Sequence, residues 1–409
     1  MNQQDLLERV RTLLRPSDDI AKLAQTVQRK ISLRVIELGI RAEVVVGGSV
    51  AKNTHLADSG DVDIFVRFLQ EHPEEEYSAL LEDILIPFKP VHVQGSRKYF
   101  QFSYRTVSFE VVPVRYITSS SDARNITDVS PLHVAYVQTH GSHLVDDIRL
   151  LKQLCKSCEV YGAESFIRGF SGHVLDILVI HYGSFLSCIQ HIAQWTLPVQ
   201  ITPIHDQQNT VKNIKQDKHI PLIVLDPIQP QRNAAAAVSE EKCLLLMEYC
   251  SRFLQNPSEE FFTLKEFDVE RLCMAHKESN FFMCVRLRCS SLRRDVAGSQ
   301  VRSLFERIVH IAKREHFILH EASWKFLSVN ESYLWFDAQP PAEHVERRGP
   351  PVSEKKHVKA FLKEHGDAYV RDAVWYALVP RRFSSLTEII FSVQDAFSDV
   401  DIEFLPKEE

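Results

Sequence analysis

Residues 44–67 read VVVGGSVAKNTHLADSGDVDIFVR, and this stretch decides the fold of the first part of the chain. A short apolar run, Val44–Val46, ends at Gly47–Ser49, which predicts a tight turn. After a polar loop, a second extended run carries Asp61 and Asp63. Side chains two residues apart on a strand point to the same face, roughly 6–7 Å apart along the chain. We therefore expect the two carboxylates to lie side by side.

The alternate residues of this run, Val62 and Ile64, are then expected to face the core. Two carboxylates beside a glycine-serine turn suit a divalent metal ion and a phosphate chain. The alternative is an acidic surface hairpin that follows a tight turn. The order of a G-[GS] turn, a polar loop and D-x-D resembles the polymerase-β-like nucleotidyltransferases, which implies metal-dependent nucleotidyl transfer.

The bulk properties are those of a globular protein with several domains. A chain of 409 residues is too long for one ordinary core, so we expect two to four domains. No apolar run approaches the roughly 20 residues of a membrane helix, and the N-terminus lacks a signal-peptide core. We therefore expect a cytoplasmic protein with no membrane partner.

The net charge of −6 argues against an indiscriminately basic nucleic-acid binder, but it leaves room for a local basic surface. From Phe281 to Lys325 there are nine Lys/Arg residues and four acidic residues. This excess indicates either a solvated face or a surface that contacts RNA.

Cys155 and Cys158 form a lone C-x-x-C inside a helical pattern, so we expect reduced, partly buried thiols rather than a closed zinc site.

Periodicity predicts an α+β protein whose first domain has a helical layer on a small mixed sheet. Helices are expected over residues 5–14, 18–38 and 78–86, and a hairpin over residues 99–112 with its turn at 105–106. The second hairpin strand carries Glu110, and Pro113 is expected to close that strand. A mostly helical pattern from Val145 to Ile192 follows.

The remaining segments read strand (281–287), helix (301–316) and a hairpin around residues 330–331. The stretch from Gln339 to Lys356 is expected to be a linker or crossing loop. We predict four domains, at residues 1–135 (catalytic head), 136–256 (helical neck that binds nucleotide), 257–340 (α/β body that binds RNA) and 341–409 (small tail that binds tRNA).

Several longer segments are similar to the archaeal-type (class I) CCA-adding enzymes. They are YGAESFIRGFSGHVLDILVIHYGSF at residues 161–185, LDPIQPQRNAAAAVS at 225–239, SPLHVAYV around His133, and RRGPPV at 347–352. The resemblance implies a tRNA nucleotidyltransferase that adds or repairs the terminal CCA from CTP and ATP without a nucleic-acid template. It also implies Mg²⁺ as cofactor, an α/β body resembling an RNA-recognition fold, and contact with the acceptor arm and TψC region of tRNA.

The resemblance also implies roles for individual residues. Asp61, Asp63 and Glu110 match the metal-binding and catalytic carboxylates. The turn residues Gly48, Ser49 and Lys52 match positions that approach the triphosphate. His133, Lys152 and Tyr161 match contacts with the sugar and phosphates of the incoming nucleotide, and Arg232 matches the arginine that helps to read the base. On pattern alone Lys152 is also consistent with a solvent-facing lysine, His133 with a loop histidine and Tyr161 with core packing.

Three departures from the family pattern qualify this prediction. Glu110 stands where the family has aspartate, and its extra methylene extends the reach by about 1.5 Å. The segment QGSRKY at residues 94–99 lacks the acidic, proline-containing form of the family, and the C-terminus looks short. These departures motivate two alternatives: an enzyme that adds only part of CCA or acts on another small RNA, and an inactive RNA-binding relative. The sequence leaves the oligomeric state open, a homodimer included.

Overall fold

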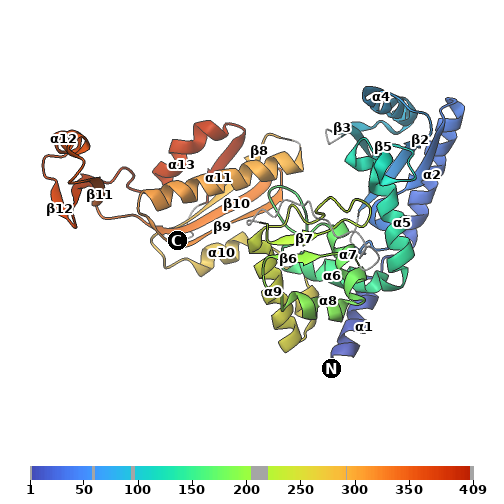
Figure 1. Ribbon diagram of the computed structural model, residues 1–409, viewed down its shortest axis with the longest axis horizontal. Helices are drawn as coiled ribbons and strands as arrows, with labels where there is room; N and C mark the ends of the chain where they lie inside the picture. Colours follow the sequence, from blue (N-terminus) through green and yellow to red (C-terminus); the bar gives the residue numbers. More distant parts are fainter. Residues whose placement is uncertain (1, 58–59, 94–96, 204–219, 292, 406–409) are drawn as a thin grey trace. The chain divides into compact units, whose positions relative to one another are not determined.

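The computed structural model describes residues 2–57, 60–93, 97–203, 220–291 and 293–405 (Figure 1). The chain divides into two compact units, Met1–Lys265 and Glu266–Glu409, and each unit is described by itself. The first unit contains a sheet domain and a helical domain. The second contains two further sheets.

A five-stranded mixed sheet forms the head of the first unit. The strand order is β1-β2-β5-β4-β3; only β2 and β5 are parallel, and the other pairs are antiparallel. The strands are β1 (Ala42–Val46), β2 (Asp61–Phe68), β3 (Val91–Val93), β4 (Tyr99–Tyr104) and β5 (Val107–Arg115). The predicted small mixed sheet is therefore confirmed.

Two amphipathic helices cover one face of this sheet, as Figure 1 shows. They are α2 (Asp19–Glu37) and α4 (Glu74–Leu85). Val27 and Ile31 of α2 and Leu81 of α4 recur at helical spacing and are completely buried against the strands. Three glutamates in the first turn of α4 favour the positive end of its helix dipole. Burial of this apolar face leaves the opposite face of the sheet for polar side chains.

Two local predictions about the head differ from the structure. The expected turn at Gly47–Ser49 opens a short helix, α3 (Gly48–Ala51). Pro113 does not close its strand, because β5 continues to Arg115 and Pro113 stands opposite Val66 of β2. Proline removes a donor but its fixed φ is compatible with an extended strand, and the Pro113 carbonyl accepts a hydrogen bond from Arg97 Nη1 (2.9 Å).

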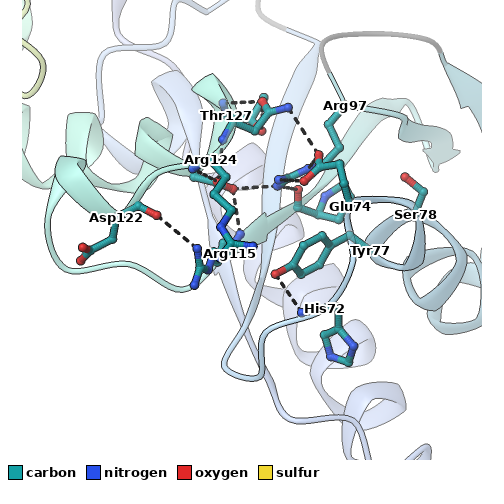
Figure 2. Close-up of polar contacts among 12 residues, drawn as sticks. His72, Glu74, Tyr77, Ser78, Arg97, Arg115, Asp122, Arg124 and Thr127 are labelled. Atoms are coloured by element: carbon teal, nitrogen blue, oxygen red, sulfur yellow. Dashed lines mark hydrogen bonds and ion pairs between the residues drawn. The ribbon is translucent and has the colours of Figure 1, made fainter.

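Figure 2 shows how Arg97 ties together segments that are distant in sequence. This buried guanidinium donates to Asp128 Oδ1 (2.7 Å) and to both carboxylate oxygens of Glu74 (2.5 and 2.8 Å). Asp128 is also buried and accepts the backbone N–H groups of Arg115, Arg124 and Asn125. The network joins the end of β5 to the start of α4. Residues 94–96 of the atypical QGSRKY segment lie outside the described residues.

A second core belongs to the helices that follow the head. The helices are α5 (Ser130–Gly141), α6 (Val145–Ser157), α7 (Gly172–Tyr182), α8 (Phe185–Ile192) and α9 (Glu240–Gln255), with a short parallel pair, β6 (Val199–Ile201) and β7 (Leu222–Val224). The N-terminal helix α1 (Gln3–Leu14) buries its apolar face in this core. Cys155 and Cys158 are free, buried thiols, and burial raises the pKa of Cys158 to about 12.

Among the described residues, no single helix has the length and apolarity to cross a membrane. Helices α7 and α8 taken together reach that length and composition, but the pair is bent by 101° at the break between them.

The larger sheet of the second unit has the strand order β14-β8-β10-β9 and is wholly antiparallel. Its elements are β8 (Phe282–Cys289), α11 (Arg294–Arg314), β9 (Ile318–Ser328), β10 (Glu331–Gln339), α13 (Leu386–Gln394) and β14 (Val400–Phe404). The order β-α-β-β-α-β is that of the ferredoxin-like motif, which RNA-recognition modules share. The helices α11 and α13 lie on one face, and α10 (Val269–Ala275) lies on the other (Figure 1).

A three-stranded sheet, β11-β13-β12, is inserted between β10 and α13. Its elements are β11 (His344–Pro351), α12 (Lys355–Glu364), β12 (Tyr369–Arg371) and β13 (Val374–Pro380). The expected linker at residues 339–356 thus contains a strand, because Val345–Arg348 pairs with β13. After this insertion the chain returns to the larger sheet. The domain boundaries given above remain predictions.

Candidate functional site: carboxylates, lysines and an aspartate hub

The three predicted carboxylates come from two neighbouring parallel strands. Asp63 on β2 stands opposite Glu110 on β5, and Asp61 stands opposite Ser108. Val62 and Ile64 are completely buried toward α2 and α4, as predicted. Side chains alternate along a strand, so all three carboxylates belong to the face of the sheet that those helices do not cover.

Gly48 allows the α3 turn to approach the strand that carries Asp63. Its φ of +56° lies in the left-handed region, and a Cβ atom there would be 1.7 Å from Asp63 Oδ2. The Gly47 N–H also donates to the Asp63 carbonyl (2.8 Å). Burial raises the pKa of Asp63; the Asp61 charge adds to this effect, and Lys52 opposes it. The α3 turn therefore packs directly against the Asp63 carboxylate and restricts its position.

Glu110 is held from the other side. Gln101 on β4 is its antiparallel partner, and Gln101 Nε2 donates to Glu110 Oε1 (2.5 Å). The two acids of β2 and the one of β5 thus form an all-oxygen donor set on one sheet face. Such a set fits a hard divalent cation. The Glu110 side chain is oriented by Gln101 on the neighbouring strand.

A buried carboxylate joins the two predicted phosphate lysines. Lys52 Nζ donates to Asp176 Oδ2 (2.9 Å), and Lys152 Nζ lies 3.0 Å from Asp176 Oδ1 as an ion pair. Lys152 also donates to Thr54 Oγ1 (2.8 Å) and to the Thr54 carbonyl (3.3 Å). Asp176 is 1% exposed, and although burial opposes its charge, the lysines hold its pKa below the ordinary value.

Arg149 fastens the same loop to α6. Its Nε donates to the His55 carbonyl (3.0 Å), and its Nη2 donates to the carbonyl (2.6 Å) and side chain (2.8 Å) of Asn53. Asn53 has a φ of +54°, which asparagine tolerates better than most residues. Arg149 and Lys152 lie one turn apart on α6 and hold the loop that leads from α3 toward Asp61.

Asp226 gathers the predicted base and sugar contacts. His133 Nε2 lies 3.0 Å from Asp226 Oδ1, while His173 Nε2 (3.4 Å) and Arg232 Nη1 (3.3 Å) lie near Oδ2. The backbone N–H groups of Ile228 and Gln229 also donate to Oδ1 (2.9 and 3.1 Å). We call this group the Asp226 hub.

Electrostatics favour the hub as a hydrogen-bonded centre. Asp226 is fully buried; burial alone would raise its pKa, but His133 and His173 hold it below the ordinary value. Burial lowers the pKa of His173 to about 4 despite the neighbouring carboxylate. His133, His173 and Asp226 offer ligand atoms within 4.8 Å of one another. Asp226 already accepts two backbone N–H groups and lies beside the Arg232 cation. We therefore interpret the group as a hydrogen-bonded cluster rather than a metal site.

Tyr161 lies near the lysine pair. A Cβ atom on Gly172, the first residue of α7, would be 3.1 Å from the Tyr161 hydroxyl and 3.6 Å from Lys152 Cε. Tyr161 is half-buried and forms an isolated bridge with Phe170. Ser49 is half-buried in α3, where its carbonyl accepts from Thr54 N (2.9 Å).

The structure thus places the predicted residues in three groups: the carboxylates with Gly48, the lysines joined by Asp176 with Tyr161 nearby, and His133 with Arg232 at Asp226. The sequence analysis missed the connecting residues, Asp176, Asp226 and Thr54. Asp176 had a detectable signal, since it is the only acid in the apolar run VLDILVI and a buried charge requires a partner.

Three family descriptions match consecutive parts of the chain. "Nucleotidyltransferase domain" matches residues 28–133, "tRNA nucleotidyltransferase, second domain" matches 146–263, and "CCA-adding enzyme, C-terminal domain" matches 278–399. Their order along the chain follows that of the sheet domain, the helical domain and the second unit.

Solved structures show a similar fold over 64% of the chain. The Cid1 poly(U) polymerase with bound Mg 3′-dATP aligns with a TM-score of 0.53 and 12% identity, over 64% of this chain and 98% of that chain. CdnC of E. coli MS115-1, in complex with HORMA-deltaN, aligns with a TM-score of 0.50 and 13% identity, over 64% and 94%.

Curated relatives extend over most of the chain. The CCA-adding enzyme of Halobacterium salinarum is 30% identical, covering 88% of this chain and 81% of the relative. The CCA-adding enzymes of Nanoarchaeum equitans (28%; 89% and 89%) and Methanocaldococcus jannaschii (26%; 94% and 89%) are also similar. The chain belongs to the family of archaeal-type CCA-adding enzymes.

Proposed function

We propose that this protein adds or repairs the 3′-terminal CCA of tRNA without a nucleic-acid template, using CTP and ATP. The observation that carries the proposal is the Asp63–Glu110 pairing on adjacent parallel strands, with Asp61 on the same face and Gly48 closed over Asp63. Family membership over most of the chain supports tRNA as the acceptor. The reaction joins the tRNA 3′-oxygen to the α-phosphorus of the nucleotide and releases pyrophosphate.

We assign Asp61, Asp63 and Glu110 to a pair of Mg²⁺ ions. All their donor atoms are carboxylate oxygens, and one sheet face presents them together, which suits this cation. When bound, such a pair stabilises charge on the attacking and leaving oxygens. The carboxylates also offer an acceptor for the proton of the 3′-hydroxyl. Gly48 packs against Asp63 and Gln101 donates to Glu110, which restricts the positions of these two carboxylates.

We assign the triphosphate to Gly48, Ser49 and the lysine pair, with Tyr161 beside it. Lys52 and Lys152 face one carboxylate, Asp176, so this group carries a surplus of one positive charge. That surplus stabilises the negative charge that builds up on pyrophosphate as it leaves. Positioning and charge stabilisation account for most catalysis of phosphoryl transfer.

We assign base and sugar recognition to the Asp226 hub. Arg232 has a planar guanidinium that can face a base edge and a phosphate together. Asp226 limits its rotation by accepting from Nη1, and His133 lies on the other oxygen. Nucleotide choice then depends on where the hub and the RNA end hold this side chain.

We assign contact with the acceptor arm and TψC region to the second unit. Its larger sheet has the topology of RNA-recognition modules. Segment 281–325 adds a local excess of basic residues. Phosphate contacts from such residues position an RNA duplex without reading its sequence.

The test measures incorporation of labelled CMP and AMP into three tRNA acceptors, which lack the terminal A, CA or CCA. Each nucleotide is supplied singly and together with the other. Addition of C, C and A in order supports the proposal. Incorporation of only C or only A supports partial addition, which Glu110 motivates because it replaces the usual aspartate. Failure of the wild-type protein on all three acceptors, or activity that survives Asp61→Ala, overturns the proposal.

A further inference from the structure

Asp176 faces two lysines from different parts of the first unit. Lys52 follows α3 in the head, Lys152 lies on α6, and Asp176 lies on α7. Both ammonium groups are within 3.0 Å of the carboxylate. Because one lysine is enough to neutralise Asp176, the second charge is available to an anion.

The two lysines are not equivalent. Lys152 has a side chain that is 4% exposed; it donates to two Thr54 oxygens and forms an ion pair with Asp176 Oδ1. Lys52 is more exposed, at 9%, and reaches Asp176 from the α3 turn beside Asp63. Lys152 is therefore the more firmly held of the two, and Lys52 is the lysine that can turn farther toward a ligand.

Asp176 also differs in its two oxygens. Lys52 donates a hydrogen bond to Oδ2, while Oδ1 is buried with an ion-pair contact to Lys152 and no aligned hydrogen bond among the described residues. A buried carboxylate that loses its partner is destabilised strongly. Lys52 can leave Asp176 at low cost only because Lys152 remains beside it.

We propose that Asp176 is a positioning residue for the triphosphate, which holds Lys52 until phosphate replaces it while Lys152 keeps Asp176 neutralised. The proposal rests on the function proposed above and adds to the phosphate-binding role of Lys152 a second action through Asp176. Removal of Lys152 then locks Lys52 onto Asp176. Removal of the Asp176 charge as well releases Lys52 again.

The experiment compares wild type, Lys152→Met and the double variant Lys152→Met/Asp176→Asn. The probe is inorganic tripolyphosphate at a fixed Mg²⁺ concentration, with Kd measured by calorimetry. We expect Lys152→Met to weaken binding about tenfold, and the double variant to recover to within about threefold of wild type, a coupling typical of residues in contact. Lys242→Met serves as the control. It removes an ammonium group on α9 that donates a hydrogen bond to the Glu159 carbonyl.

Both variants are expected to fold, because Lys152→Met leaves the Lys52–Asp176 pair and the double variant removes the buried charge. Thermal unfolding checks this, and Asp176→Glu, which keeps the charge, is expected to stay within about threefold of wild type. A double variant that binds as weakly as Lys152→Met overturns the inference, as does wild-type protein that incorporates CMP but does not bind tripolyphosphate. Wild-type protein that incorporates nothing refutes the proposed function instead.

Discussion

Asp63 Oδ2 lies 1.7 Å from the position that a Cβ atom on Gly48 would occupy. A side chain at position 48 therefore cannot coexist with the present position of this carboxylate. Gly48 also has a φ of +56°, so a substitution there meets backbone strain in addition. The close packing of the α3 turn against the carboxylate-bearing face of the sheet thus depends on the absence of a side chain at position 48.

We expect Gly48→Ala to lower kcat/KM for CMP addition about 100-fold, since a displacement of about 1 Å at a reacting centre costs that much. Single-turnover incorporation at saturating Mg²⁺ measures the effect. Gly366→Ala is the control, because a Cβ atom there meets nothing within 4 Å. A Gly48→Ala enzyme with normal activity contradicts the close approach to Asp63.

Glu110 is expected to tolerate a shorter carboxylate better than a neutral isostere. Glu110→Asp keeps the negative charge but breaks the contact with Gln101, so we expect activity at a raised Mg²⁺ requirement. Glu110→Gln removes a charged oxygen donor and should reduce activity about 100-fold or more, as other losses of electrostatic stabilisation do. Activity titrated against Mg²⁺ separates the two. Equal losses in both variants would show that the length of the side chain matters as much as its charge at this position.

Local and distant features differ in how far the sequence predicts them. The same-face placement of Asp61 and Asp63 follows from the period of a strand, so 24 residues of sequence were enough. The alignment of Asp63 with Glu110 requires the parallel pairing of β2 with β5, which no local pattern specifies.

The connecting acids depend on still longer separations. Lys52 and Asp176 are 124 residues apart, and His133 and Asp226 are 93 apart. The polar character of these residues is visible in the sequence, but their partners are chosen by helix packing. At Pro113 the local signal was misleading. Proline predicted the end of the strand, but β5 continues past it, and the Pro113 carbonyl accepts a hydrogen bond from Arg97.

Neutralising the hub should affect nucleotide choice more than RNA binding. Asp226→Asn retains an acceptor for the backbone donors but weakens its hold on Arg232, so we expect the preference for CTP and ATP over UTP and GTP to fall about tenfold. Steady-state kinetics with each nucleotide measure this, with the KM for tRNA as the internal control. A uniform loss for all four nucleotides would argue that Asp226 serves stability alone.

The hub also predicts a pH dependence of stability. Burial lowers the pKa of His173 to about 4, so below pH 6.5 the unfolded chain binds a proton that the folded chain excludes. The stability present above pH 6.5 is therefore lost as the pH falls toward 4, by up to about 3 kcal/mol. Urea unfolding at pH 7 and pH 4.5 should show a smaller difference in His173→Phe. Parallel losses in both proteins would assign the acid sensitivity elsewhere.

Arg97 is expected to be a major determinant of head stability. Arg97→Met leaves Asp128 buried without its cation and should destabilise the protein by about 3 kcal/mol, in the range for breaking a buried pair. Arg124→Met is the matched control, because this exposed arginine pairs with Glu71 and should change stability by less than about 1 kcal/mol. Both arginines are labelled in Figure 2. Denaturant unfolding curves distinguish the two outcomes.

Strand β14 has a consequence for the order in which the protein is made. It pairs with β8, although about 110 residues and a complete smaller sheet are synthesised between them. Folding on the ribosome proceeds from the N-terminus, so the first unit can reach its native packing while synthesis continues. The RNA-recognition-like sheet must wait with an open edge until Val400–Phe404 emerges. Catalytic activity and RNA binding should therefore be acquired at different times during translation.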